Sequence, residues 1–106
     1  MLVAYRSPPK LSVRDMRDGA VIADRDTCGD VDDLFVDSKR QRVYVTCGEG
    51  YIDVFDERAH YAHLARIATR RGARTSLFIP ALDRLAVAIR ASGNEPAELW
   101  IYRPLP

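Results

Sequence analysis

The chain repeats itself with a period of a little over 40 residues. The segment GDVDDLFV at residues 29–36 is answered by GARTSLFI at residues 72–79, and RVYV at 42–45 is answered by RLAV at 84–87. A repeat of this length made of short strands is typical of β-propeller blades, which hold about four strands each. The period therefore predicts an all-β chain of consecutive antiparallel blades.

Short alternating segments bounded by turn residues indicate ten strands. They lie at residues 2–6, 11–15, 20–23, 31–36, 42–46, 51–56, 61–67, 74–79, 84–90 and 97–103. The repeat groups them into three blade segments of a single partial domain, at about residues 1–26, 27–70 and 71–106. These segments hold three, four and three strands, with an inner strand missing from the first and an outer strand from the last. We therefore expect an open, incomplete ring.

One segment also fits a helix. Its apolar residues follow helical spacing, and they are Tyr61, Leu64, Ala65 and Ala68. Gly72 could end such a helix, which would run over residues 57–69. The repeat, however, requires the fourth strand of the central blade at this point, so we favour a strand over residues 61–67.

The charge balance argues against binding to nucleic acid, and the lengths of the apolar stretches argue against insertion into a membrane. Sixteen basic and fifteen acidic side chains give a net charge of +1, which provides no field to gather an anionic polymer. The basic clusters at residues 39–42 and 70–71 sit in turns, where solvated side chains are the ordinary interpretation. The longest uncharged apolar stretch, residues 75–82, contains Pro80 and is too short to span a bilayer. Residues 1–6 lack the apolar core of a secretion signal.

The cysteines and histidines show no metal-site spacing. Cys28 and Cys47 are read as small buried or half-buried thiols, with a disulfide as the open alternative because both lie toward the same end of one blade. His60 and His63 have no third ligand at a suitable spacing, and a zinc site needs at least three. No nucleophile motif is present, so we predict no catalytic residue, metal or cofactor in this chain.

Several segments resemble YncE-like (YVTN-type) β-propellers. They are RSPPKLSVRD at residues 6–15, DVDDLFVD at 30–37, RVYVT at 42–46, GYIDVF at 50–55 and GARTSLFIP at 72–80. The resemblance implies a seven-bladed propeller with a binding role, usually exported in bacteria, so a periplasmic or secreted location is expected for the complete parent. Related propellers carry haem or quinone chemistry, but no motif for either is found here.

The length of the chain covers only part of such a ring. Seven blades need roughly 300 residues, whereas this chain has 106 and supplies about two and a half blades. We therefore expect a fragment of a longer YncE-like protein, or a truncated relic. Its end blades would expose apolar surface and unpaired edges, which predicts marginal folding or self-association through the open blade edges.

The best candidate binding residues lie at the start of the inner strands. Asp32 and Asp33 begin one inner strand, and Arg74 and Thr75 occupy the equivalent place one blade later. Propellers commonly bind ligands at this mouth of the central channel, so we predict polar ligand contacts from these four residues. Arg74 could hold a carboxylate or phosphate, but a bridge to Asp32 or Asp33 between the blades is the favoured interpretation.

The acidic cluster that also includes Asp30 and Glu49 lacks the ligand spacing of a calcium loop. A structural role in turns and in pairing with Arg74 is therefore favoured over a metal site.

The sequence thus predicts a non-enzymatic scaffold, or a module that binds a small ligand or a protein. The alternative is a sector of a propeller enzyme, either redox or a metal-dependent hydrolase. In that case the catalytic residues would lie mostly in blades that this chain lacks.

Overall fold

The computed structural model describes all of residues 1–106 and confirms an all-β fold. It contains ten strands and a single 3-10 turn at Glu57–Ala59. The strands are β1 (Leu2–Arg6), β2 (Pro9–Arg14), β3 (Val21–Asp26), β4 (Val31–Asp37), β5 (Arg42–Cys47), β6 (Tyr51–Asp56), β7 (Ala62–Ala68), β8 (Ser76–Ile79), β9 (Arg84–Ile89) and β10 (Glu98–Tyr102). The structure has no helical segment that could span a bilayer.

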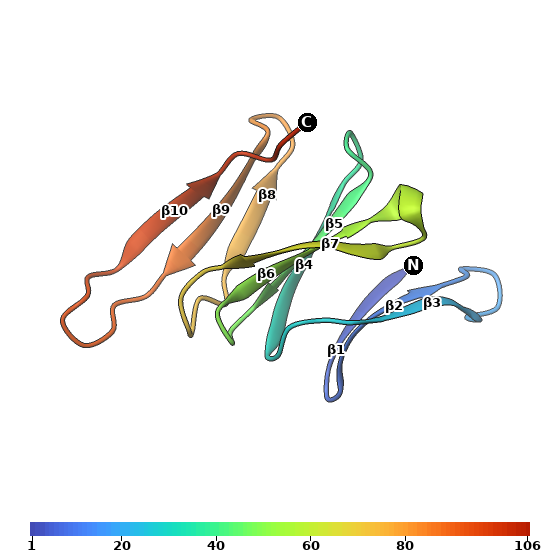
Figure 1. The fold of residues 1–106 in the computed structure, drawn as a ribbon, viewed down its shortest axis with the longest axis horizontal. Helices are drawn as coiled ribbons and strands as arrows, with labels where there is room; N and C mark the ends of the chain where they lie inside the picture. The colour runs from blue at the N-terminus through green and yellow to red at the C-terminus, as the bar shows by residue number, and fades with distance from the viewer.

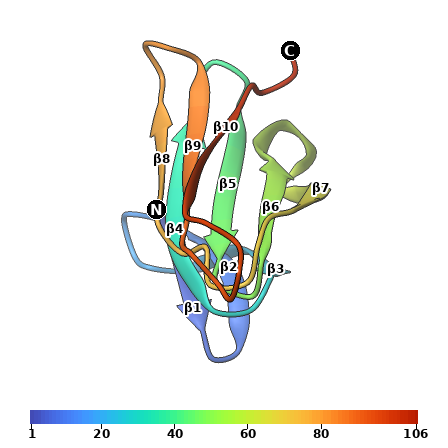
Figure 2. The ribbon, with the colours of Figure 1, turned by 90° about the vertical axis from the view of Figure 1, so that its left-hand side faces the viewer.

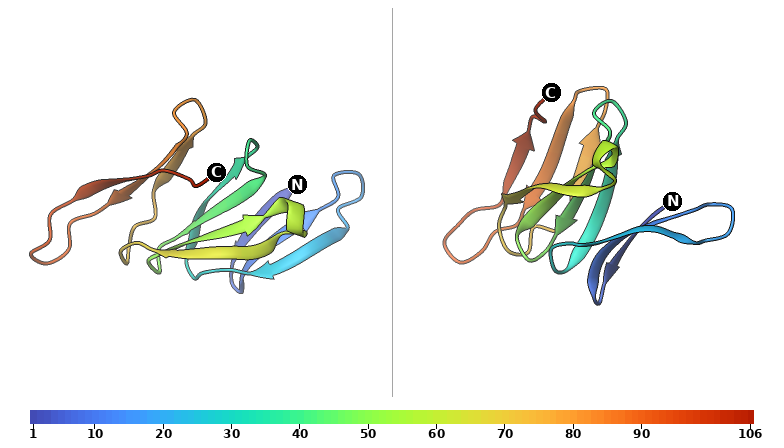
Figure 3. Two further views of the ribbon diagram at one scale, coloured as in Figure 1. Left: turned by 45° about the horizontal axis from the view of Figure 1, so that its top comes forward. Right: turned by 45° about the vertical axis from the view of Figure 1, so that its right-hand side comes forward.

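The strands form three separate antiparallel sheets of three, four and three strands, in the orders β1-β2-β3, β4-β5-β6-β7 and β8-β9-β10. We call them the first, second and third sheets. They lie side by side along the longest dimension of the molecule, with the second in the middle (Figure 1). The third sheet stands in front of the second when the stack is viewed from its end (Figure 2), and oblique views show the three sheets fanned apart (Figure 3). The predicted open, propeller-like segment is therefore observed.

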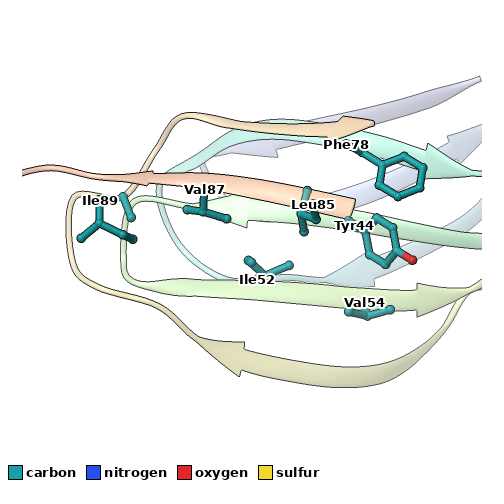
Figure 4. Packing of buried hydrophobic residues seen from close by; sticks show 8 residues of the cluster. Tyr44, Ile52, Val54, Phe78, Leu85, Val87 and Ile89 are labelled. Atoms are coloured by element: carbon teal, nitrogen blue, oxygen red, sulfur yellow. The ribbon is translucent and has the colours of Figure 1, made fainter. Parts of the chain in front are cut away.

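Two apolar layers hold the sheets together. The layer between the first and second sheets consists of Leu11, Cys28, Val31, Val43, Val45, Cys47 and Phe55. The layer between the second and third sheets consists of Tyr44, Ile52, Val54, Ala73, Phe78, Leu85, Val87 and Ile89 (Figure 4). Successive side chains of a strand point to opposite faces, so Val43 and Val45 serve one layer while Tyr44, between them, serves the other. The two middle strands of the second sheet, β5 and β6, are therefore buried on both faces, whereas β7 at its edge is mostly exposed.

The strand pairing corrects the repeat by one residue in the inner strand. The matching letters align Phe35 with Phe78 at an offset of 43. In the structure Val36 pairs with Val43 and Phe78 pairs with Leu85, so Val36, at an offset of 42, is the true equivalent of Phe78. Phe35 instead packs against the layer that contains Phe78, from the opposite side. An irregularity of β4 between Val31 and Asp33 accommodates the extra residue.

The helix considered over residues 57–69 does not form. Strand β7 pairs with β6, as the repeat predicted, with one register shift that leaves Leu64 without a cross-strand partner. Leu64 and Ala65, both part of the helical pattern, are exposed, whereas Ile67, which lies outside that pattern, packs against the apolar layer. The packing of Ile67 against the apolar layer therefore favours the strand. The helical spacing of the other apolar residues in this segment does not correspond to a buried helix face.

The thiol interpretation of the two cysteines is wrong, because Cys28 and Cys47 form a disulfide. Cys28 lies in the connection between β3 and β4, and Cys47 ends β5, with Cα atoms 5.9 Å apart. Both are buried in the layer between the first and second sheets. The bond ties the connection between these sheets to the middle of the second sheet.

Two buried carboxylates add polar links to this apolar framework. Asp37 accepts a hydrogen bond from Tyr44 (2.6 Å) and pairs with Arg40 (3.2 Å). Arg40 also pairs with Asp83 in the hairpin of the third sheet at 2.6 Å, which joins the two sheets at one end. Asp53 is the second buried carboxylate and accepts hydrogen bonds from Arg66, His63 and Thr27.

We expect the free energy of unfolding to fall when the pH drops below about 4. Burial alone would raise the pKa of Asp53, but the hydrogen bonds from Arg66, His63 and Thr27 outweigh it and hold the pKa below its usual value. Burial of Asp37 is likewise outweighed by its bonds to Tyr44 and Arg40, and its pKa is lowered. Both groups therefore confer stability above the unfolded carboxyl pKa of about 3.9, and that stability is lost as the pH falls through the folded pKa.

Urea unfolding at pH 7, 5 and 3 measures this dependence. The free energy of unfolding should be nearly constant between pH 7 and 5 and clearly lower at pH 3. A variant that carries both Asp37→Asn and Asp53→Asn should lose much of the decline. Equal or greater wild-type stability at pH 3 than at pH 5 would contradict the prediction.

Candidate functional site

The connections between successive sheets lie at the same end of the molecule as the loops that join β5 to β6 and β9 to β10. We call this the connection end, formed by residues 27–30, 48–50, 69–75 and 90–97, and it lies at the lower side of Figure 1. It contains the predicted binding residues, because β4 and β8 both start there. The hairpin between β1 and β2 reaches the same side.

Polar contacts between neighbouring sheets cross the connection end. Arg6 of the first sheet bonds to Asp32 (3.1 Å) and to the carbonyl of Val31 (2.9 Å). Asp33 accepts a hydrogen bond from the backbone of Ser76 at 2.9 Å. The Arg6 contacts tie the end of β1 to the start of β4, and the Asp33 contact ties the starts of the inner strands β4 and β8 to each other.

The predicted pairing of Arg74 with the acidic cluster is confirmed, but its partner in the cluster is Asp30 and not the favoured Asp32 or Asp33. The Arg74 guanidinium lies 2.7 Å from the Asp30 carboxylate. The reason is local: Asp30 adopts a left-handed conformation (φ 60°) just before β4, which places its carboxylate at the Arg74 guanidinium. The backbone oxygen of Thr75 accepts a hydrogen bond from Ala88. The binding role of Asp32, Asp33, Arg74 and Thr75 stays a prediction.

A polar pocket of about 360 Å³ opens beside this bridge, between the second and third sheets. It is lined by Gly29, Asp30, Gly48, Glu49, Arg71, Gly72, Arg74 and Arg90, with no apolar side chain among them. We call it the arginine pocket. Its wall is a continuous backbone network, since Gly48 donates to the carbonyl of Asp30 (2.7 Å) and accepts from the amide of Gly72 (2.7 Å).

Two glycines allow the charged groups to lie directly on the backbone. A Cβ at position 48 would collide with the carboxylate of Asp30 and lie 2.9 Å from Nε of Arg74. At position 72 the backbone φ is +87°, and a Cβ there would lie 2.8 Å from Nε of Arg90. Any larger residue would displace these guanidinium groups.

The pocket has uncompensated positive charge. Three arginines outnumber two carboxylates in it: Asp30 pairs with Arg74, and Glu49 keeps its negative charge while it accepts the backbone N–H of Gly29 at 2.6 Å. The guanidinium groups of Arg71 and Arg90 make no hydrogen bond or ion pair within the chain. Guanidinium groups bind carboxylates and phosphates through paired N–H donors, so the site is suited to an anionic group.

Sequence reasoning missed both of these arginines. The sequence predicts a solvated basic turn at Arg71 and the end of a strand at Arg90. The available signal was Gly72, which follows Arg71 and precedes the next repeat. Its contact with Arg90, 18 positions later, depends on how β9 returns to the connection end.

No group of three or more His, Cys, Asp or Glu side chains is arranged to hold a metal ion. His63 bonds to the buried Asp53 at 2.9 Å, and His60 ends the 3-10 turn in a left-handed conformation. The two histidines therefore have separate surroundings.

The chain was compared with known proteins. No protein-family model matches it, no curated protein matches it, and no solved structure matches it. The YncE-like resemblance therefore stays an expectation from the sequence.

Proposed function

We propose that this chain is a sector of a non-enzymatic, propeller-type binding module, and that its arginine pocket receives the anionic group of a small ligand or of a protein partner. The observation that supports the proposal is the pair of unpartnered guanidinium groups, Arg71 and Arg90, in a pocket without apolar lining. The YncE-like resemblance supports the same class of function.

The electrostatics favour an anion over a neutral ligand. Three arginine side chains share the pocket with only two carboxylates, and both carboxylates are bonded within the chain. An incoming carboxylate or phosphate would gain charge-assisted hydrogen bonds, each worth about 1.5–3 kcal/mol. The Asp30–Arg74 pair would act as a fixed wall that keeps the ligand beside Arg71 and Arg90.

Titration with inorganic phosphate and with succinate, followed by NMR or calorimetry, tests this function. Replacing both Arg71 and Arg90 with alanine should weaken binding by at least about 10-fold, because two guanidinium donors are lost. Arg58→Ala is a matched control, since its side chain is exposed and lies in the 3-10 turn outside the pocket. Higher salt should weaken binding as well.

Two outcomes would refute the pocket. One is the absence of any saturable anion binding to the wild-type chain at low salt. The other is binding that responds to Arg58→Ala as strongly as to the double replacement.

A further inference from the structure

The arginine pocket holds opposite charges that do not pair with each other. Arg71 and Arg90 carry unpartnered guanidinium groups, and the carboxylate of Glu49 lies in the wall of the same pocket. Glu49 forms no ion pair with either arginine or with any other cation of the chain. The pocket therefore offers a ligand two separate binding points of opposite charge.

Only one of the two carboxylate oxygens of Glu49 is engaged. Oε2 accepts the backbone N–H of Gly29 at 2.6 Å, and a Cβ at position 29 would collide with that oxygen. The missing side chain of Gly29 thus allows the carboxylate to lie directly on the backbone. Oε1 makes no hydrogen bond or ion pair within the chain. Glu49 therefore presents a carboxylate that is held in place and has a free acceptor oxygen.

The opposite charge is held on a different connection. The guanidinium of Arg90 lies against Gly72, where an added Cβ would come within 2.8 Å of its Nε. Gly29 belongs to the connection before β4, and Gly72 belongs to the connection before β8. Gly48 links these connections, because it donates to the carbonyl of Asp30 and accepts from the amide of Gly72. The backbone therefore fixes where the carboxylate and the guanidinium lie relative to each other.

The second carboxylate of the pocket, that of Asp30, is already compensated. One of its oxygens accepts from Nε of Arg74 at 2.9 Å and lies 2.7 Å from Nη2 of the same side chain. Its other oxygen lies 3.6 Å from the guanidinium of Arg6. Glu49 is therefore the carboxylate of this pocket whose negative charge is left for a ligand.

We propose that the ligand of the arginine pocket is a small zwitterion, a molecule with one carboxylate and one ammonium group, such as an amino acid. Its carboxylate binds Arg71 and Arg90, and its ammonium group donates to Oε1 of Glu49. A purely anionic ligand would meet the Glu49 carboxylate as a repulsion, whereas an ammonium group makes a charge-assisted hydrogen bond there. The assignment rests on the proposed function, because the arginines must bind an anionic group, and it makes Glu49 the residue that selects the class of ligand.

NMR titrations at pH 7 and low salt test the zwitterion as the ligand. Glycine, β-alanine and 4-aminobutyrate are each compared with the carboxylate that lacks the amino group, namely acetate, propionate and butyrate. The backbone amide signals of Gly29, Gly48 and Gly72 report binding at the pocket. At least one amino acid should bind the wild-type chain about 5-fold more tightly than its matched carboxylate, as expected for one ion pair at an exposed site.

Glu49→Gln is the decisive variant, because it removes the negative charge and keeps the size of the side chain. It should abolish the advantage of the amino acid and leave the plain carboxylate bound at least as tightly as before. Glu57→Gln is the matched control, since it makes the same change of net charge at an exposed side chain in the 3-10 turn outside the pocket. The control should keep the advantage of the amino acid.

Four results would overturn the zwitterion as the ligand. They are equal binding of every amino acid and its matched carboxylate, an advantage that persists in Glu49→Gln, an advantage that Glu57→Gln also removes, and loss of plain carboxylate binding in Glu49→Gln. In each case, carboxylate binding to the wild-type chain that disappears when Arg71 and Arg90 are both replaced with alanine still supports the proposed function. If no carboxylate or amino acid binds the wild-type chain, the proposed function fails as well. Glu49 is exposed, and thermal melts of each variant verify that the fold is kept.

Discussion

Replacing Asp53 with alanine should lower the free energy of unfolding by about 3 kcal/mol. The Asp53 side chain is fully buried and accepts hydrogen bonds from two nitrogens of Arg66, at 2.8 and 3.0 Å. It also accepts bonds from the Thr27 hydroxyl (3.0 Å) and from the backbone N–H of Cys28 (2.8 Å). The variant would leave the buried Thr27 hydroxyl and Cys28 N–H without an acceptor, which costs about 1–3 kcal/mol for each, whereas Arg66 and His63 are 43% and 42% exposed and can bond to water.

The position of Asp53 explains why one side chain should matter so much. Thr27 and Cys28 belong to the connection from the first sheet, whereas Arg66 and His63 lie on the outer strand of the second sheet. A single carboxylate therefore joins the entry of the chain into the second sheet to that sheet's far edge. Without it, the connection at residues 27–28 and strand β7 lose a shared anchor.

Urea unfolding of three variants separates these contributions. Asp53→Asn keeps the shape and one acceptor oxygen, so we expect a loss between that of Asp53→Ala and zero. Asp24→Ala is the control, because Asp24 is an exposed aspartate on β3 with no side-chain bond of its own in this chain. A loss below about 1 kcal/mol for Asp53→Ala would show that the network does not stabilise the fold.

Replacing Phe55 with alanine should cost about 4 kcal/mol, within the range of 3–5 kcal/mol known for large aromatic residues in cores. Phe55 is completely buried in the layer between the first and second sheets, beside Val43 and Val45. Its ring meets the His63 ring edge-on, with centroids 5.4 Å apart. The truncation would leave a cavity between the two sheets. Because the strands on either side are fixed by their backbone hydrogen bonds, they can move only partly into this space.

The matched control for Phe55 is Leu64→Ala. Leu64 lies on the adjacent strand β7 but is 49% exposed, so its truncation should cost less than about 0.5 kcal/mol. Trp100 adds a local probe, because it packs on the layer between the second and third sheets. If the sheets unfold as one unit, Trp100 fluorescence and far-UV circular dichroism will change together in Phe55→Ala. Similar losses for the two variants would contradict the assigned packing.

Much of the fold could be predicted because local signals and the repeat agree. The turn residues bracket β6 so clearly that its expected bounds, 51–56, are those of the structure. Where the local signals were ambiguous, as at residues 57–69, the repeat chose the strand correctly. The period of about 42 residues carries this information because each sheet must present the same faces to its neighbours.

The candidate site was less predictable. Arg74 pairs with Asp30 because Asp30 has a left-handed backbone conformation. The neighbouring residues in the sequence do not predict that conformation. The placement of Phe35 against the apolar layer that contains Phe78 depends on an irregularity within β4. Single-residue shifts of this kind leave the apolar pattern almost unchanged, yet they reverse which face a side chain occupies.

The sequence by itself determined the strands, their grouping into three, four and three, and the open character of the stack, because alternation, turn residues and the period are all local or repetitive signals. Only the tertiary structure decided the disulfide between Cys28 and Cys47, the network around Asp53 and the arginine pocket. Each of these joins residues from different strands or connections. Their meeting depends on how the sheets stack and on the register of individual strands, and no local pattern in the chain encodes either one.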